Sequence, residues 1–90
     1  MSSADSILIV EDDVNSAFVL KAILQKAGYS ILPIASSGEM ALQLAEEHHP
    51  SLLLMDITLS GSLDGIDTTL KIKQKYDVPV IYLTGYTSED

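Results

Sequence analysis

Four short apolar runs alternate with segments of helical periodicity along this chain. The first run, residues 6–10 (Ser-Ile-Leu-Ile-Val), has the length and the β-branched content of a strand. A continuous apolar run of this kind is typical of a strand covered on both faces, as in a parallel sheet. Similar runs occupy residues 30–35, 52–55 and 78–83. The pattern therefore predicts four strands.

The intervals between these runs have the spacing of helices. Across residues 14–27, apolar side chains recur every three or four positions, at Leu20, Ile23, Leu24 and Ala27. Residues 36–39 (Ser-Ser-Gly-Glu) resemble a helix start, and this second helix should end before Pro50. A third helix is expected over roughly residues 66–76, after a glycine-bearing loop. Strands alternating with helices predict an α/β fold with right-handed crossovers.

Pro33 indicates where the second strand lies in the sheet. Proline has no backbone N–H to donate to a neighbouring strand, so within sheets it is confined mainly to edges. Because Pro33 falls inside the run at residues 30–35, we expect that run to form an edge strand.

Composition narrows the classes of function. The 90 residues include 13 acidic side chains and five lysines, with no arginine and a net charge of −8, which disfavours nucleic-acid binding. No apolar stretch approaches the roughly 20 residues of a membrane span, and no basic segment of a secretory signal precedes the first run. The chain has no cysteine, which excludes disulfides and thiolate metal sites. We expect a cytoplasmic protein without membrane or nucleic-acid contacts.

Polar residues follow three of the four predicted strands. Glu11, Asp12 and Asp13 follow the first strand, Asp56 the third and Thr84 the fourth. In a parallel sheet the carboxyl ends of all strands lie at one edge, where ligands bind. Two carboxylates about 4 Å apart repel each other by on the order of 4 kcal/mol at an effective dielectric of 20. A Mg²⁺ ion bound between the carboxylates would relieve this repulsion. Asp13 need not belong to such a site, because an acid at the start of a helix is also favoured by the helix dipole.

Taken together, these segments resemble the receiver domains of two-component response regulators. The resemblance runs from Ile7 to Asp90 and is carried by the motifs ILIVEDD, ASSGEMAL, LLLMDI, DGI and VPVIYLTGY. It implies a three-layer, flavodoxin-like (CheY-like) α/β fold with a parallel sheet of strand order 2-1-3-4. The fifth strand and the last helices of that fold would be missing.

The resemblance also implies a role for each residue of the site. Asp56 is the expected phosphoacceptor, taking a phosphoryl group from a sensor histidine kinase or a phosphotransfer protein. Asp12 is the expected direct Mg²⁺ ligand and Glu11 a ligand through water. Asp56 itself and the backbone carbonyl of Thr58 complete the set, and Thr84 is the expected switch hydroxyl. The chain would accept a phosphoryl group without being a turnover enzyme.

Two departures from the family pattern affect this expectation. Ser60 stands where most receivers have a proline, in a loop that is one residue longer. The family's fifth strand, which carries an essential lysine, is not in the sequence, and residues 87–90 resemble the start of a further helix. We therefore expect residues 1–90 to be a single receiver domain that is incomplete at its C-terminus. Its fourth strand would then be an unpaired edge of the sheet, which could pair with a second copy of the chain in a homodimer.

Two other classes of function stay open at this point. One is an interaction module that keeps the receiver surface and works without phosphorylation. The other is a phosphatase with an aspartate nucleophile, which needs a second acid two residues after the nucleophile. Thr58 occupies that position, so the phosphatase ranks last.

Overall fold

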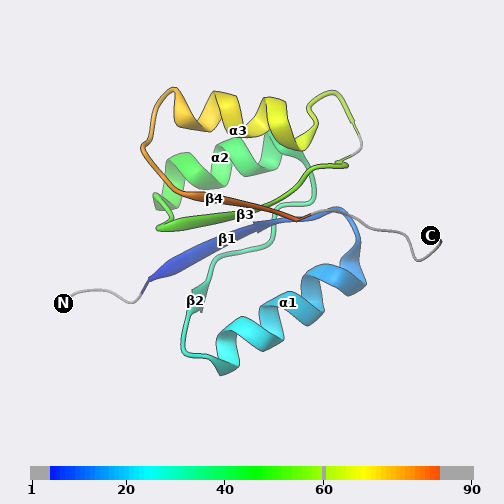
Figure 1. Ribbon diagram of the computed structural model, residues 1–90, viewed down its shortest axis with the longest axis vertical. Coiled ribbons are helices and arrows are strands. Elements are labelled where there is room, and N and C mark those ends of the chain that lie inside the picture. The colour runs from blue at the N-terminus through cyan, green and yellow to red at the C-terminus, as the bar shows by residue number, and fades with distance from the viewer. Residues whose placement is uncertain (1–4, 60, 84–90) are drawn as a thin grey trace.

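The computed structural model describes residues 5–59 and 61–83 of the chain. Within these residues, strands and helices alternate along the sequence (Figure 1). In chain order, the elements are β1 (Ser6–Val10), α1 (Val14–Lys26), β2 (Ser30–Ile31), α2 (Gly38–His48), β3 (Leu52–Asp56), α3 (Gly65–Lys73) and β4 (Val80–Leu83).

The strands form one parallel sheet in the order β2-β1-β3-β4. β1 pairs with β2 and β3, and β4 extends the sheet from β3. The predicted fold class and the strand order 2-1-3-4 are confirmed. All four carboxyl ends point the same way because the strands are parallel, so the residues that follow them gather at one edge.

β2 lies at the sheet edge, as predicted, but is shorter than residues 30–35. Its regular pairing with β1 covers Ser30–Ile31. Beyond Pro33, which has no N–H to donate, the Ala35 amide donates to the Ile9 carbonyl at 2.9 Å. The preceding donor to β1 is the Leu32 amide, which bonds the Ile7 carbonyl at 3.0 Å. These two donors are three residues apart instead of two, so the regular register ends and pairing resumes only as an isolated bridge. The amide of residue 33 would point away from β1, so a proline is tolerated there at the sheet edge.

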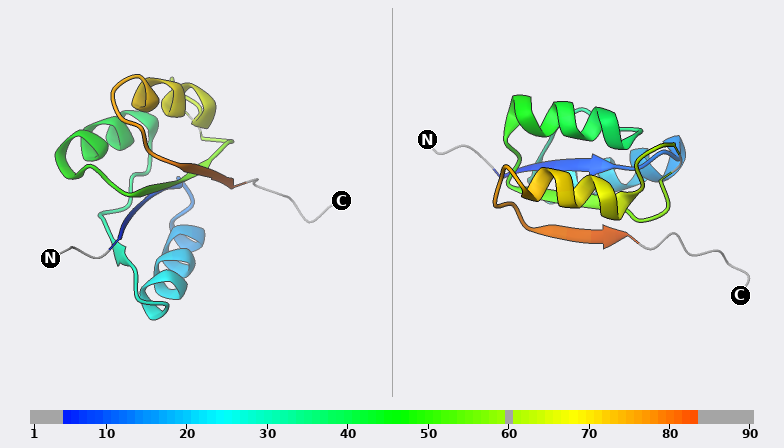
Figure 2. Two further views of the ribbon diagram at one scale, coloured as in Figure 1. Left: turned by 60° about the vertical axis from the view of Figure 1, so that its left-hand side comes forward. Right: turned by 90° about the horizontal axis from the view of Figure 1, so that it is seen from above.

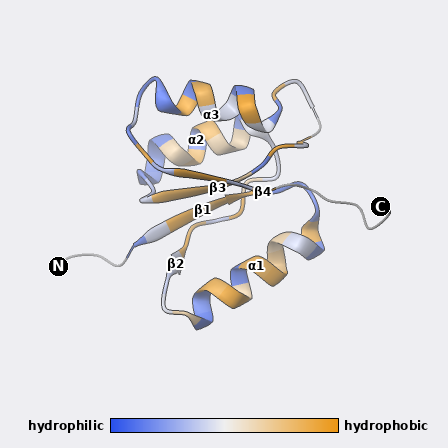
Figure 3. Cartoon of the chain, viewed as in Figure 1, coloured by the Kyte–Doolittle hydropathy of each residue, from blue (hydrophilic) through white to orange (hydrophobic). Residues whose placement is uncertain are grey.

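Helices cover both faces of the sheet in three layers. α2 and α3 lie side by side on one face, and α1 lies on the other (Figures 1 and 2). The apolar character of the central strands is visible along β1 and β3 in Figure 3. Their side chains alternate between the two layers, with Leu8, Val10, Leu53 and Met55 in the α2/α3 core and Ile7, Ile9 and Leu54 in the α1 core.

Each helix begins at a polar side chain that accepts a hydrogen bond from the amide three residues later. These bonds measure 2.9, 3.1 and 2.8 Å, and each satisfies a backbone donor that the first turn leaves without a helical partner. The capping residues are Asp13, Ser37 and Asp64. In the part of the chain that the structure describes, no helix is long and apolar enough to cross a membrane.

Two details of the helices differ from the sequence prediction. Of the predicted apolar stripe of α1, Leu20 and Leu24 are partly buried, whereas Ile23 is 59% exposed and Ala27 is exposed at the C-cap. α1 packs over β1 and β2, so its sheet-facing stripe runs through Ala17, Leu20 and Leu24 instead. α3 ends at Lys73, earlier than the predicted residue 76.

Candidate functional site

The candidate site is built at the carboxyl ends of the two central strands. Val10, the last residue of β1, pairs with Met55 of β3, so Glu11 and Asp56 leave the sheet side by side. Asp56 is only 3% exposed, while Glu11 and Asp12 are half-buried. The pairing of β1 with β3 therefore places the Glu11 and Asp56 carboxylates next to each other.

Three carboxylates gather closely at this edge. One oxygen from each of Glu11, Asp12 and Asp56 lies within 4.8 Å of the others. Among the described residues, these are the ones grouped closely enough to share an ion in a set of three. Carboxylate oxygens are the ligands that Mg²⁺ prefers, and it binds through a few of them together with water. The residues present therefore fit a magnesium ion.

Burial, more than the neighbouring carboxylates, governs the pKa of Glu11. Burial raises the pKa of the Glu11 carboxyl to about 7. A hydrogen bond with Asp56 and the charges of Asp56 and Asp12 act in the same direction, while the Asp13 amide, which donates to Glu11 at 3.0 Å, opposes it. A cation bound beside Glu11 would favour the ionised form of its carboxyl and so lower this pKa.

Asp13 belongs to α1 and not to the carboxylate group. Its side chain accepts hydrogen bonds from the Ser16 amide at 2.9 Å and from the Ser16 hydroxyl at 2.6 Å. The hydroxyl bond is the main reason that the Asp13 pKa is lowered. The interpretation of Asp13 as an acid at the start of a helix is therefore confirmed.

Thr58 contacts the buried carboxylate in a way that was not predicted from the sequence. Its backbone amide and its side-chain hydroxyl both donate to Asp56 Oδ1, each at 2.9 Å. The resemblance implies a role only for the Thr58 carbonyl, and that role as a metal ligand stays a prediction. The spacing Asp-x-Thr was a usable signal, because an aspartate after a strand commonly accepts bonds from the backbone two residues on.

Gly65 is a second residue whose importance the sequence did not reveal. It is the first residue of α3, and a Cβ built there would overlap the carbonyl oxygen of Asp56 and lie 2.8 Å from the Ile57 Cα. Only a glycine lets the start of α3 approach the end of β3 so closely. The backbone that carries Asp56 is therefore packed directly against α3.

Not every predicted site position falls within residues 5–59 and 61–83. Thr84, the expected switch hydroxyl, and Ser60, the variant loop position, lie outside the described residues. The structure brings together Glu11, Asp12, Asp56 and Thr58, and the role of each stays a prediction.

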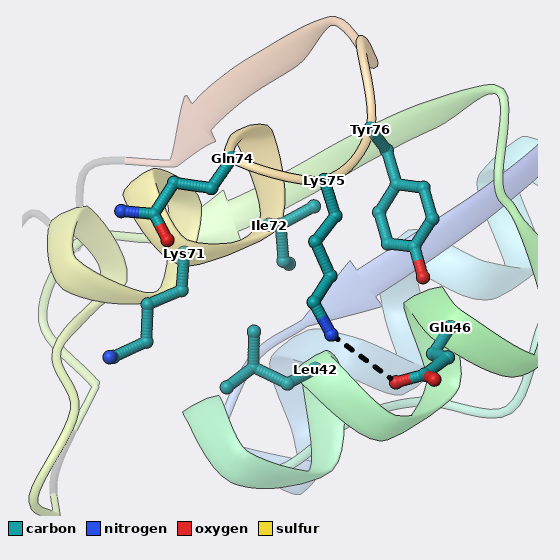
Figure 4. A pocket seen from close by; sticks show the side chains of 7 residues that line it. All are labelled: Leu42, Glu46, Lys71, Ile72, Gln74, Lys75 and Tyr76. Atoms are coloured by element: carbon teal, nitrogen blue, oxygen red, sulfur yellow. Dashed lines mark ion pairs between the residues drawn. The ribbon is translucent and has the colours of Figure 1, made fainter.

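A separate cavity of about 230 Å³ lies between α2 and α3, toward the opposite edge of the sheet (Figure 4). Leu42 and Ile72 line it, and Lys75 Nζ lies 3.8 Å from Glu46 Oε1 across its mouth. Both charged side chains are about two-thirds exposed, so their pairing contributes little. The acidic edge of the sheet is the stronger candidate for chemistry.

Comparison with known proteins gives consistent matches. A family model described as the response regulator receiver domain matches residues 7–90. Transcriptional regulatory protein PdtaR of Mycobacterium tuberculosis is 36% identical over 84 residues, covering 93% of this chain and 40% of that protein. The chain thus spans about two fifths of the length of this curated relative.

Solved structures give the same picture. The N-terminal domain of a response regulator/sensory box/GGDEF protein from Carboxydothermus hydrogenoformans matches with a TM-score of 0.86 and 41% identity, over 93% of this chain and 67% of that one. Anti-anti-sigma factor PhyR from Bartonella quintana, solved in complex with anti-sigma factor NepR, matches with a TM-score of 0.85 and 28% identity. That match covers 94% of this chain and 35% of the PhyR chain.

Proposed function

The chain belongs to the family of response regulator receiver domains, and from that premise we propose that it accepts a phosphoryl group on Asp56. Receiver domains are signalling domains of two-component systems and in general are not enzymes. In the proposed reaction this chain is likewise an acceptor and not a turnover enzyme. The donor is a phosphohistidine on a sensor histidine kinase or on a phosphotransfer protein.

The observation that supports this proposal most strongly is the gathering of Glu11, Asp12 and Asp56 at the carboxyl end of the sheet. Asp56 is nearly buried at the end of β3, yet its side chain reaches an edge where two further carboxylates lie. A buried acid among other acids is costly unless it binds a cation. Such an arrangement is suited to holding Mg²⁺ beside a nucleophilic carboxylate.

The proposed roles follow from where each group lies. Asp56 is the nucleophile: one of its oxygens attacks phosphorus, and the bond from phosphorus to the donor imidazole nitrogen breaks. Asp12 and Asp56 would bind Mg²⁺ directly, Glu11 through a water molecule, and the Thr58 carbonyl would complete the protein ligands. When bound, the ion neutralises charge that develops on the transferred group. Thr84 is the proposed switch hydroxyl that hydrogen-bonds a phosphoryl oxygen afterwards.

The setting of this reaction is also part of the proposal. The net charge of −8 favours protein or small-molecule donors over a nucleic-acid ligand, and we expect the module to work in the cytoplasm. A homodimer through β4 is proposed as well, because Ile81 and Tyr82 on this edge strand are 53% and 41% exposed.

A second candidate function is an interaction module that works without phosphorylation. The relative PhyR, solved with an anti-sigma factor bound, is the observation that favours it, since a receiver-containing protein there binds a regulatory partner. This function would require the fold and its surfaces but not the three carboxylates.

Beryllofluoride, which mimics a phosphoryl group on aspartate, separates the two candidates. With Mg²⁺ present, it should shift the backbone amide resonances around Asp56, Glu11 and Thr58. Asp56→Asn should abolish these shifts while the rest of the spectrum stays that of a folded protein. Equal spectra with and without beryllofluoride and Mg²⁺ would favour the interaction module.

A further inference from the structure

The cavity between α2 and α3 has an apolar floor beneath an open mouth (Figure 4). Ile72 on this floor is 1% exposed, and Leu42 and Tyr76 beside it are partly buried against the core. A volume of about 230 Å³ has room for several water molecules, but the hydrocarbon groups of the floor offer them no hydrogen bonds. Displacing such water with an apolar group is favourable.

Tyr76 forms a preformed aromatic wall of this cavity. It also lines a second cavity of about 170 Å³, whose lining includes His49. The rings of His49 and Tyr76 meet edge to face, with their centroids 5.1 Å apart. The Tyr76 amide donates to the Ile72 carbonyl at 2.9 Å, in the turn that follows α3. The backbone and one side of the ring are therefore held in place, while the ring lines the larger cavity.

Lysines concentrate at the mouth of the larger cavity. The chain has five lysines against 13 acidic residues, and three of the five fall within residues 71–75. Lys71 lies in the last turn of α3, Lys75 in the turn that follows, and both line the cavity. Among the described residues, Lys71 forms no ion pair, and Lys75 pairs only with the exposed Glu46, at 3.8 Å. The mouth is therefore locally positive in a chain of net charge −8.

We propose that this cavity binds a small aromatic carboxylate. The ligand's ring would lie on the apolar floor against Tyr76, and its carboxylate would lie between the two lysines at the mouth. There it would replace Glu46 beside Lys75, a contact that is weak because both side chains are about two-thirds exposed. The cavity is smaller than the roughly 300–1,000 Å³ of most ligand pockets, which favours a single ring with a short acidic chain.

Three compounds with the same phenyl ring test the need for a negative charge. 3-Phenylpropionate carries the carboxylate, 3-phenylpropanamide is uncharged and 3-phenylpropylamine is cationic. Each is titrated into the whole chain at physiological salt and followed by NMR. 3-Phenylpropionate should bind in about the millimolar range expected for its size and shift the resonances of Leu42, Ile72 and Tyr76. The amide should bind at least about threefold more weakly, and the amine more weakly still.

Single-charge variants identify the groups at the mouth. Lys71→Gln and Lys75→Gln should each weaken binding of 3-phenylpropionate about two- to fivefold, as for an exposed ion pair. Glu46→Gln should tighten binding by a similar factor, because it removes the competing carboxylate. Lys73→Gln is the matched control, since it changes the net charge equally on the same turn of α3 but does not line the cavity. All four side chains are exposed, so the fold should be preserved.

Several results would overturn the proposal. These are no shifts at millimolar 3-phenylpropionate, shifts centred on α1 or β4 instead of the cavity, or equal affinity for the three compounds. An effect of Lys73→Gln as large as that of the two cavity lysines would also exclude a defined site. None of these measurements depends on phosphorylation of Asp56, so the proposal can fail while the proposed function stands.

Discussion

Replacing Gly65 with alanine tests how firmly the backbone of Asp56 is held. Gly65 is the first residue of α3, and alanine favours the helical conformation over glycine by about 0.5–1 kcal/mol. Helix propensity alone therefore predicts that Gly65→Ala stabilises the protein. The packing at this position predicts the opposite.

The magnitude follows from what the new methyl group would meet. Its Cβ would overlap the Asp56 carbonyl oxygen and lie 2.8 Å from the Ile57 Cα. Both neighbours are backbone atoms, so they cannot rotate away as a flexible side chain would. Overpacking of this kind costs about 1–3 kcal/mol, and the propensity gain offsets part of it. We expect a net loss of about 1–2 kcal/mol in the free energy of unfolding.

Urea unfolding monitored by circular dichroism measures this loss. Lys71→Ala is the matched control, because Lys71 is exposed on the same helix and such a change is usually within about 0.5 kcal/mol of neutral. Gly65→Ala should also weaken stabilisation by Mg²⁺, since the displaced backbone carries Asp56. A variant as stable as the unmodified protein, with unchanged response to Mg²⁺, would refute the claim that α3 holds Asp56 in place.

Three further predictions concern the site and the sheet edge. Millimolar Mg²⁺ should raise the melting temperature, and Asp12→Ala should remove that gain; no change in the unmodified protein would count against a metal site. Without divalent ions, the raised pKa of Glu11 stabilises the fold fully below pH 4.5, and this contribution is lost as the pH rises through about 7. In Glu11→Gln the free energy of unfolding should not show this loss between pH 4.5 and about 7. The prediction is contradicted if the variant and the unmodified protein lose stability equally over this range. Sedimentation at micromolar concentration should show self-association that Ile81→Lys, on the exposed face of β4, reduces; a monomer that unfolds cooperatively would exclude it.

Local patterns predicted most of the fold because each element carries its own signal. The apolar run at Ser6–Val10 and the cap at Ser37 are readable from neighbouring residues, and β1 and α2 begin as expected. Pro33 correctly indicated an edge strand, but the sequence did not show that regular pairing of β2 would end at Ile31. Ile23 and Ala27 of the predicted stripe are exposed, because periodicity does not reveal which strands the helix covers.

The site was partly predictable for a similar reason. Carboxylates that follow the strands must meet at one edge of a parallel sheet, so Glu11, Asp12 and Asp56 could be grouped in advance. The contacts of Gly65 with the Asp56 backbone depend on how closely α3 approaches β3, and no local pattern records that distance. The resemblance implies a role only for the Thr58 carbonyl, so the contact of its hydroxyl with Asp56 was not predicted.

The most direct test of the central claim is to find which residue takes the phosphoryl group. The chain is incubated with acetyl phosphate and Mg²⁺, and the modified residue is located by peptide mass mapping, with Asp56→Asn and a magnesium-free sample as controls. The account predicts one phosphoryl group on Asp56, absent from both controls. A label on Asp12 or Asp64, or a label on Asp56 that does not require Mg²⁺, would contradict it.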